Sequence, residues 1–85
     1  MTQSKNYIEA YTDYPIERLG DKLYKPAPVR SCKIIGYDGN KYAKIRVGRY
    51  VETIKLGYCY KENGRSGEVK IFMHDEVCKF FNIEE

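Results

Sequence analysis

The sequence has no tryptophan, a single histidine and three cysteines that lie far apart in the chain. An odd number of widely spaced cysteines argues against the disulfide framework that is typical of small secreted proteins. The N-terminal stretch MTQSKNYIEAYTDYPIERL has no apolar core of signal-peptide length, and no window reaches the length needed to span a membrane. We therefore expect a cytoplasmic protein with reduced thiols and no membrane partner.

Residues that would catalyse a reaction or hold a cofactor are equally scarce. His74 could act as a base only beside a nucleophile or an acid, and its spacing to Cys59 and Cys78 does not indicate such a pair. The three cysteines and His74 could in principle form a zinc site, but structural zinc ligands usually come in close pairs, and the pair His74 and Cys78 has no matching pair at Cys32 and Cys59. The turns GYDGN and ENGRSG lack the lysine and helix of a nucleotide-binding loop. We predict a protein that binds rather than catalyses, without metal or cofactor.

Charge is distributed unevenly along the 85 residues. The segment 29–70 holds ten Lys or Arg and four acidic residues, a net charge of +6, whereas the rest of the chain holds five basic and eight acidic residues, a net charge of −3. A basic stripe is typical of proteins that bind polyanions. A solvated surface without a partner produces the same pattern, so both interpretations stay open on charge alone.

Hydrophobic periodicity predicts a mostly β structure. The stretch VRSCKIIGY is rich in β-forming residues and runs into Asp38-Gly39-Asn40, a strong hairpin signal. We expect strands near 29–37, 41–47, 50–60 and 68–73, with Gly48 as a bend or a bulge. The fold class is α+β: one small domain over residues 1–85, built as an antiparallel β-meander or an SH3-like barrel of four to five strands with a short C-terminal helix.

The two ends of the chain carry the remaining expected elements. A helix is expected near 75–83, where Asp75 can cap it and Val77, Phe80 and Phe81 form an apolar stripe. At the other end, the helical spacing of Tyr7, Ile8 and Tyr11 predicts a short helix or a flexible segment over residues 1–14. A further edge strand is expected near 19–25.

Alternation in KYAKIRVGRY, residues 41–50, defines a candidate binding surface. Tyr42, Lys44 and Arg46 share one parity, and the opposite parity, which should face the core, holds Ala43, Ile45 and Val47. Cations that follow a backbone and rings that stack on bases form the usual surface for single-stranded nucleic acid. Because Tyr and Lys are also ordinary on the solvent face of strands, a merely solvated face is the alternative. The candidate nucleic-acid-binding residues are Tyr42, Lys44, Arg46, Arg49, Lys33, Lys55, Lys61 and Arg65.

The turn YDGN between SCKIIG and KYAKIRVG resembles the hairpins of Tudor and SH3-like barrels. The whole chain, short, rich in Tyr, Lys and Ile and without a catalytic set, is similar to the small accessory proteins of T-even bacteriophages, which commonly bind and redirect a host factor. Within that group, its size and basic character resemble the phage inhibitors of the ToxN endoribonuclease toxin. The resemblance implies an anti-defence, antitoxin-like role in the host cytoplasm, in which the protein binds the toxin together with RNA, and it carries over no site residue.

Two other functions are compatible with the same residues. One is an inhibitor or adaptor that binds another host factor through protein contacts, without nucleic acid. The other is a structural or capsid accessory protein, which would form stable homo-oligomers. The sequence does not identify the partner, does not distinguish RNA from DNA or from an acidic protein surface, and does not fix the oligomeric state.

Overall fold

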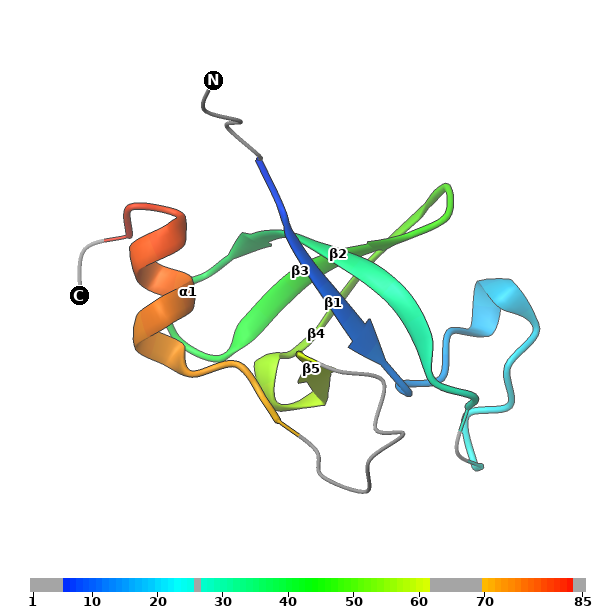
Figure 1. The fold of residues 1–85 in the computed structure, drawn as a ribbon. Helices are drawn as coiled ribbons and strands as arrows, with labels where there is room; N and C mark the ends of the chain where they lie inside the picture. The colour runs from blue at the N-terminus through cyan, green and yellow to red at the C-terminus, as the bar shows by residue number, and fades with distance from the viewer. Residues whose placement is uncertain (1–5, 26, 62–69, 84–85) are drawn as a thin grey trace.

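The computed structural model describes residues 6–25, 27–61 and 70–83, which form a small compact domain with one open sheet of five antiparallel strands and one short helix (Figure 1). The strand order in the sheet is β4-β3-β2-β1-β5. Two short 3-10 turns interrupt the connections, at Glu17–Leu19 and Leu56–Tyr58. The other elements are β1 (Ile8–Thr12), β2 (Arg30–Tyr37), β3 (Tyr42–Val47), β4 (Tyr50–Lys55), β5 (Cys59–Tyr60) and α1 (His74–Phe80).

The hairpin between β2 and β3 forms where the sequence predicts it. Asp38 holds the turn because its Oδ1 accepts the backbone N–H groups of Asn40, Lys41 and Tyr42 at 2.7, 2.9 and 3.1 Å. The N–H of Asn40, with those of Tyr42 and Lys41, holds the pKa of the Asp38 carboxyl below its usual value. Gly39 sits in the turn at φ +80°, a conformation that glycine adopts without strain.

The prediction for the N-terminal segment is wrong over its described part. Residues 8–12 form β1 rather than a helix, and β1 lies between β2 and β5 in the sheet. Ala10 and Thr12 are buried by this pairing, and the Thr12 hydroxyl donates to the carbonyl of Tyr58 at 2.8 Å. The sheet therefore overrides a weak helical spacing. Residues 1–5 of the expected segment lie outside the described part of the chain.

The strand expected near 19–25 is also corrected. The chain turns at Glu17–Leu19 and again at Gly20, whose φ is +88°, so this stretch cannot extend along a sheet edge. The turn is closed by Asp21, which accepts the N–H of Ile16 at 2.7 Å and binds the Arg30 guanidinium with both carboxylate oxygens, at 2.7 and 3.0 Å. A polar contact between side chains that are nine residues apart thus determines the path of the loop.

The strand expected over 50–60 is divided. The 3-10 turn Leu56–Tyr58 separates β4 from β5 and carries the chain across to β1. Gly48 is neither a bend within a strand nor a bulge: at φ +60° it takes the first position of a two-residue turn between Val47 and Tyr50, as in a type II′ hairpin. The sheet does contain an irregularity, but it lies on β2, between Ile34 and Gly36.

The C-terminal elements are shorter than expected. Of the strand expected at 68–73, the described residues 70–73 contribute an isolated bridge between Ile71 and Tyr60, and residues 68–69 lie outside the described part.

The helix expected near 75–83 is α1, and Asp75 lies in its first turn instead of capping it. The N–H of Met73 is bound by the Glu76 carboxylate at 2.7 Å, and that N–H, together with Lys61, holds the pKa of Glu76 below its usual value. Val77 and Cys78 are the buried residues of the helix, and Phe80 is exposed.

The core forms on one side of the sheet because buried residues alternate along each long strand. In Figure 1, α1 lies at one end of the sheet, next to the turn that connects β2 and β3, and Val77 joins the core cluster there. The strand residues of the core are Ala10, Cys32, Ile34, Ala43, Ile45, Val47, Ile54 and Cys59. The side chains between them therefore lie on the opposite face, which we call the open face.

Candidate nucleic-acid interface

The open face carries the basic side chains of β3 that the sequence singles out. Tyr42, Lys44 and Arg46 are exposed, whereas their neighbours Ala43 and Ile45 are fully buried. The predicted parity is therefore confirmed over β3. The alternation of polar and apolar residues along β3 determines which side chains face the core, since a strand turns successive side chains to opposite faces.

Strand register brings further cations to the same face. Lys33 on β2 pairs directly with Arg46, and Lys55 on β4 pairs directly with Tyr42. Two cations that face each other across a strand pair destabilise a sheet, because like charges at that distance repel. An anion bound between Lys33 and Arg46 would remove this repulsion. The sequence identified both residues but could not place them next to each other.

Strand β1 and Tyr7, the residue before it, add three residues that the sequence does not single out as candidates. Glu9 pairs with Lys33, and Tyr11 pairs with Ser31, so both lie on the open face. The ammonium of Lys33 also lies 4.7 Å from the centre of the Tyr7 ring, a cation–π distance. The alternation of Tyr7, Glu9 and Tyr11 in YIEAYT is a period-two signal, and it competes with the helical spacing of Tyr7, Ile8 and Tyr11.

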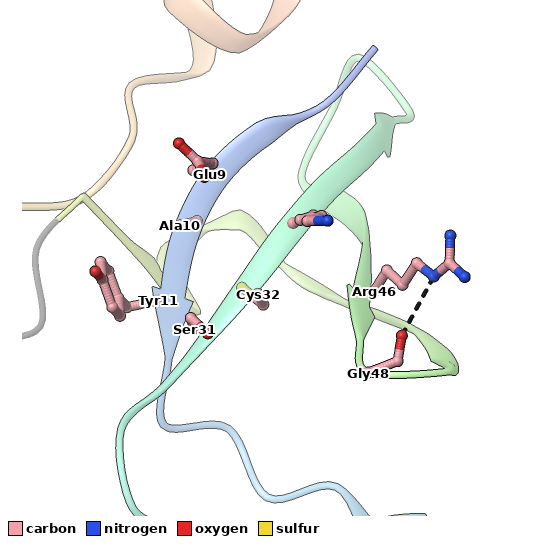
Figure 2. A pocket seen from close by; sticks show the side chains of 8 residues that line it. Glu9, Ala10, Tyr11, Ser31, Cys32, Arg46 and Gly48 are labelled. Carbon is pink, nitrogen blue, oxygen red and sulfur yellow. Dashed lines mark hydrogen bonds between the residues drawn. The ribbon is translucent and has the colours of Figure 1, made fainter. Parts of the chain in front are cut away.

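A hollow of about 470 Å³ lies across β1, β2 and β3 on this face (Figure 2). It forms because Ser31 and Gly48 carry little or no side chain, next to the long side chains of Lys33 and Arg46. The Arg46 Nε donates to the carbonyl of Gly48 at 3.3 Å, which holds the guanidinium near the β3–β4 turn, as the dashed line in Figure 2 shows. Its two terminal nitrogens keep their donors for a ligand. The lining residues are Glu9, Ala10, Tyr11, Ser31, Cys32, Lys33, Arg46 and Gly48.

The remaining candidate residues lie elsewhere. Arg49 is exposed in the two-residue turn after β3, next to the open face. Lys61 follows β5, and its ammonium binds the Glu76 carboxylate at 2.9 Å and lies 5.6 Å from the centre of the Phe72 ring. The structure therefore separates Lys61 from the cations of β3. Arg65 lies outside the described residues.

The three cysteines are buried, and no disulfide bond joins them. Burial raises the pKa of the Cys32 thiol to about 11, and burial with the nearby Cys32 raises the pKa of Cys59 to about 12. Cys78 lies one helical turn from His74, with its sulfur 3.6 Å from Nε2, but only 2% of the residue is exposed. A thiol at this depth has no access to a substrate, although a nucleophile and a base do meet.

Over residues 6–25, 27–61 and 70–83, no three His, Cys, Asp or Glu side chains come together in an arrangement that could hold a metal ion. Among the same residues, no helix has the length and apolar character to cross a membrane. Comparison with protein-family models, with curated proteins and with solved structures finds no match to this chain. The site must therefore be interpreted from its own geometry.

Proposed function

We propose that this protein binds single-stranded RNA through the open face and does not catalyse a reaction. The observation that carries the proposal is the direct pairing of Lys33 with Arg46, with Lys44 two residues before Arg46 on β3. This arrangement of cations lies next to the hollow and near the rings of Tyr7 and Tyr11. Cations for phosphates and rings for bases are the two components of single-strand recognition.

The biological role follows from the resemblance of the chain to small phage accessory proteins. On that basis, we propose that the protein acts in the host cytoplasm as an anti-defence inhibitor that binds a toxin endoribonuclease together with RNA. A pull-down from host lysate with tagged protein, with and without ribonuclease, tests this role. We expect the toxin to be captured and to be lost after ribonuclease treatment; capture of neither toxin nor RNA would contradict the proposal.

The finer architecture that we propose is an SH3-like barrel. The 3-10 turn Leu56–Tyr58 supports it, because this turn carries the chain from β4 to β5, and β5 then pairs with β1 at the far side of the sheet. The bulge on β2 also supports it, because bulges increase the local twist and curvature that a small barrel needs. An experimental structure with β4 and β5 as widely separated, flat edges would contradict this architecture.

RNA titration at several salt concentrations tests the proposed binding. Lys44→Ala and Arg46→Ala should each weaken the binding of every RNA sequence and reduce the slope of log K against log salt by about 0.7, the value for one single-strand phosphate contact. Tyr42→Ala should cost about 1–3 kcal/mol of binding free energy, with little change in slope, because it removes stacking rather than charge.

The matched control is Lys22→Ala, which removes an exposed lysine from the loop between β1 and β2, away from the open face. It lowers the net charge of the protein as much as Lys44→Ala does, so it corrects for long-range attraction. If the folded Lys44 and Arg46 variants bind RNA no more weakly than the Lys22 variant, the open face is only solvated.

A second candidate function, binding of a protein partner without nucleic acid, is favoured by a different surface. The rings of Tyr14 and Tyr58 lie 4.9 Å apart, and both are partly exposed. With Pro15 and Leu23 they line a hollow of about 360 Å³, to which Asp13 adds a carboxylate. Aromatic surfaces of this kind bind extended peptide segments. If Tyr58→Ala abolishes capture of a host protein while RNA binding stays intact, this second function is supported instead.

A further inference from the structure

The open face has a second hollow, on the β4 side of the first. It has a volume of about 520 Å³ and spans β2, β3 and β4. It forms at the irregularity of β2, where the register shifts between Ile34 and Gly36, and Gly36 leaves space opposite Lys44. The lining residues are Ile35, Gly36, Tyr37, Asp38, Tyr42, Lys44 and Thr53.

The two hollows have the same three components. Each has a tyrosine among its lining residues, Tyr11 in the first and Tyr42 in the second. Each also has a cation from β3 and a glycine, which carries no side chain, among its lining residues: Arg46 with Gly48 in the first hollow, and Lys44 with Gly36 in the second. A flat ring can occupy such a space and stack on the tyrosine while the cation binds the attached phosphate.

The spacing of Lys44 and Arg46 along the backbone of β3 is comparable to the spacing of nucleotides in a single strand. Lys44 and Arg46 are two residues apart on one strand, so their Cα atoms are separated by about 6.8 Å. This separation is close to the distance between successive phosphates in an extended single strand. Glu9, at the β1 side of the first hollow, repels phosphate, so phosphates lie over β3 and the first base lies towards β1.

We propose, resting on the RNA-binding function above, that the open face holds two successive nucleotides of single-stranded RNA. One base occupies each hollow, and Arg46 and Lys44 bind the phosphates. Lys33 supplies a second cation in the first hollow. The occupant is RNA rather than an acidic protein segment, because each of the two hollows has space for one ring and has one cation beside it. Single-stranded RNA presents one base and one phosphate in each successive nucleotide.

Titration of the full-length protein with RNA oligonucleotides of one to six residues at constant low salt tests the proposal. Affinity should rise by about ten- to a hundred-fold from the mononucleotide to the dinucleotide, which is the gain expected for one more stacked base. From two to six nucleotides, it should rise only slightly. Gly36→Val fills the second hollow and should therefore remove most of the rise in affinity from the mononucleotide to the dinucleotide. The affinity for the mononucleotide should fall by no more than about twofold, because one hollow remains.

Gly57→Val is the matched control, since Gly57 lies in the 3-10 turn outside both hollows and a Cβ there meets no atom within 4 Å. A Cβ at Gly36 lies 3.7 Å from the Lys44 Cβ, an ordinary contact, so Gly36→Val should fold. Ser31→Val fills the first hollow from an exposed strand position and should also remove most of the gain in affinity from the mononucleotide to the dinucleotide. This second variant tests the two-nucleotide site if the Gly36 variant does not fold.

The possible failures are distinguishable. If the wild-type protein binds long RNA without a step between one and two nucleotides, or if both folded filling variants bind dinucleotides as tightly as the Gly57 variant, the two-nucleotide site is wrong and RNA binding itself survives. If the wild-type protein binds RNA of no length, the proposed function fails and the site fails with it.

Discussion

The hydroxyl of Tyr37 lies 2.7 Å from His74 Nδ1 and ties the end of β2 to the first residue of α1. The same hydroxyl donates to the carbonyl of Asn40 at 2.9 Å. Because a tyrosine hydroxyl carries one proton, the bond to His74 must use the proton on Nδ1. Nε2, the other ring nitrogen, faces the Cys78 sulfur at 3.6 Å. The hydrogen-bond network thus places a proton on Nδ1 and connects the hairpin to the helix.

Tyr37→Phe should lower the free energy of unfolding by about 1–3 kcal/mol, because it removes two hydrogen bonds that each contribute about 0.5–1.5 kcal/mol net. The ring is kept, so its edge-on contact with His74, at 5.5 Å between centres, should persist. Urea unfolding followed by circular dichroism measures the change. Tyr42→Phe is the control, because it removes a tyrosine hydroxyl from the exposed face of β3. Equal stability of the two variants would show that the hydrogen bonds of the Tyr37 hydroxyl to His74 and Asn40 contribute nothing.

Ile45→Ala should lower the free energy of unfolding by about 2–5 kcal/mol, because the side chain is fully buried and its loss leaves a cavity. RNA binding by the fraction that remains folded should be unchanged, since Ile45 points away from the open face. Thermal unfolding combined with RNA titration below the transition separates the two effects. Lys44→Ala, one residue away and exposed, should change stability by less than about 0.5 kcal/mol. The reverse order of the two stability effects would contradict the assignment of the two faces.

The protein should lose stability in acid partly through Asp21. The hydrogen bond from Arg30, with that from the N–H of Ile16, holds the pKa of this carboxyl below its usual value in the folded state. A carboxyl with a lowered pKa stabilises the fold above its unfolded pKa, near 3.9, and this contribution is lost as the pH falls through the folded pKa. Asp21→Asn should therefore reduce stability at pH 7 and flatten the decline below about pH 4.

Urea unfolding at a series of pH values measures this effect. Glu17→Gln, which changes an exposed carboxylate in the 3-10 turn before Asp21, serves as the control. If Asp21→Asn leaves the acid decline as steep as in the wild-type protein, the decline arises from other carboxylates, among which Asp38 and Glu76 have lowered pKa values in the described part of the chain.

The three thiols should react slowly with a thiol-specific reagent at pH 8, because all are buried and the pKa values of Cys32 and Cys59 are raised to about 11 and about 12. Labelling followed by mass spectrometry should show one rate, set by opening of the fold, and the rate should rise in urea. Fast labelling of one cysteine in native buffer would contradict its burial.

Cys59→Ser should lower stability by about 1–3 kcal/mol, because it puts a hydroxyl in a fully buried position. RNA binding should be retained at temperatures where the variant is folded. If the folded variant fails to bind RNA, the thiol has a role in binding that its position behind the open face does not suggest.

Local patterns in the sequence account for the β2–β3 hairpin and for the two faces of β3. Asp38, Gly39 and Asn40 specify their own turn through contacts within four residues. Alternation over KYAKIRV is long enough to decide which side chains face the core, because a strand has a side-chain period of two. Both features depend on residues close together in the chain, which is why the sequence by itself determined them.

Only the tertiary structure decided what lies beside these residues. A stretch as short as residues 7–12 fits a helical and a strand period almost equally well, and its pairing with β2 and β5 selects the strand. The meeting of Lys33 with Arg46 depends on a register that shifts between Ile34 and Gly36, and a slip of one residue would move every later side chain of that strand to the other face. Because register is set by packing across strands rather than by neighbours in the chain, the basic residues could be named from the sequence, but the site they form could not.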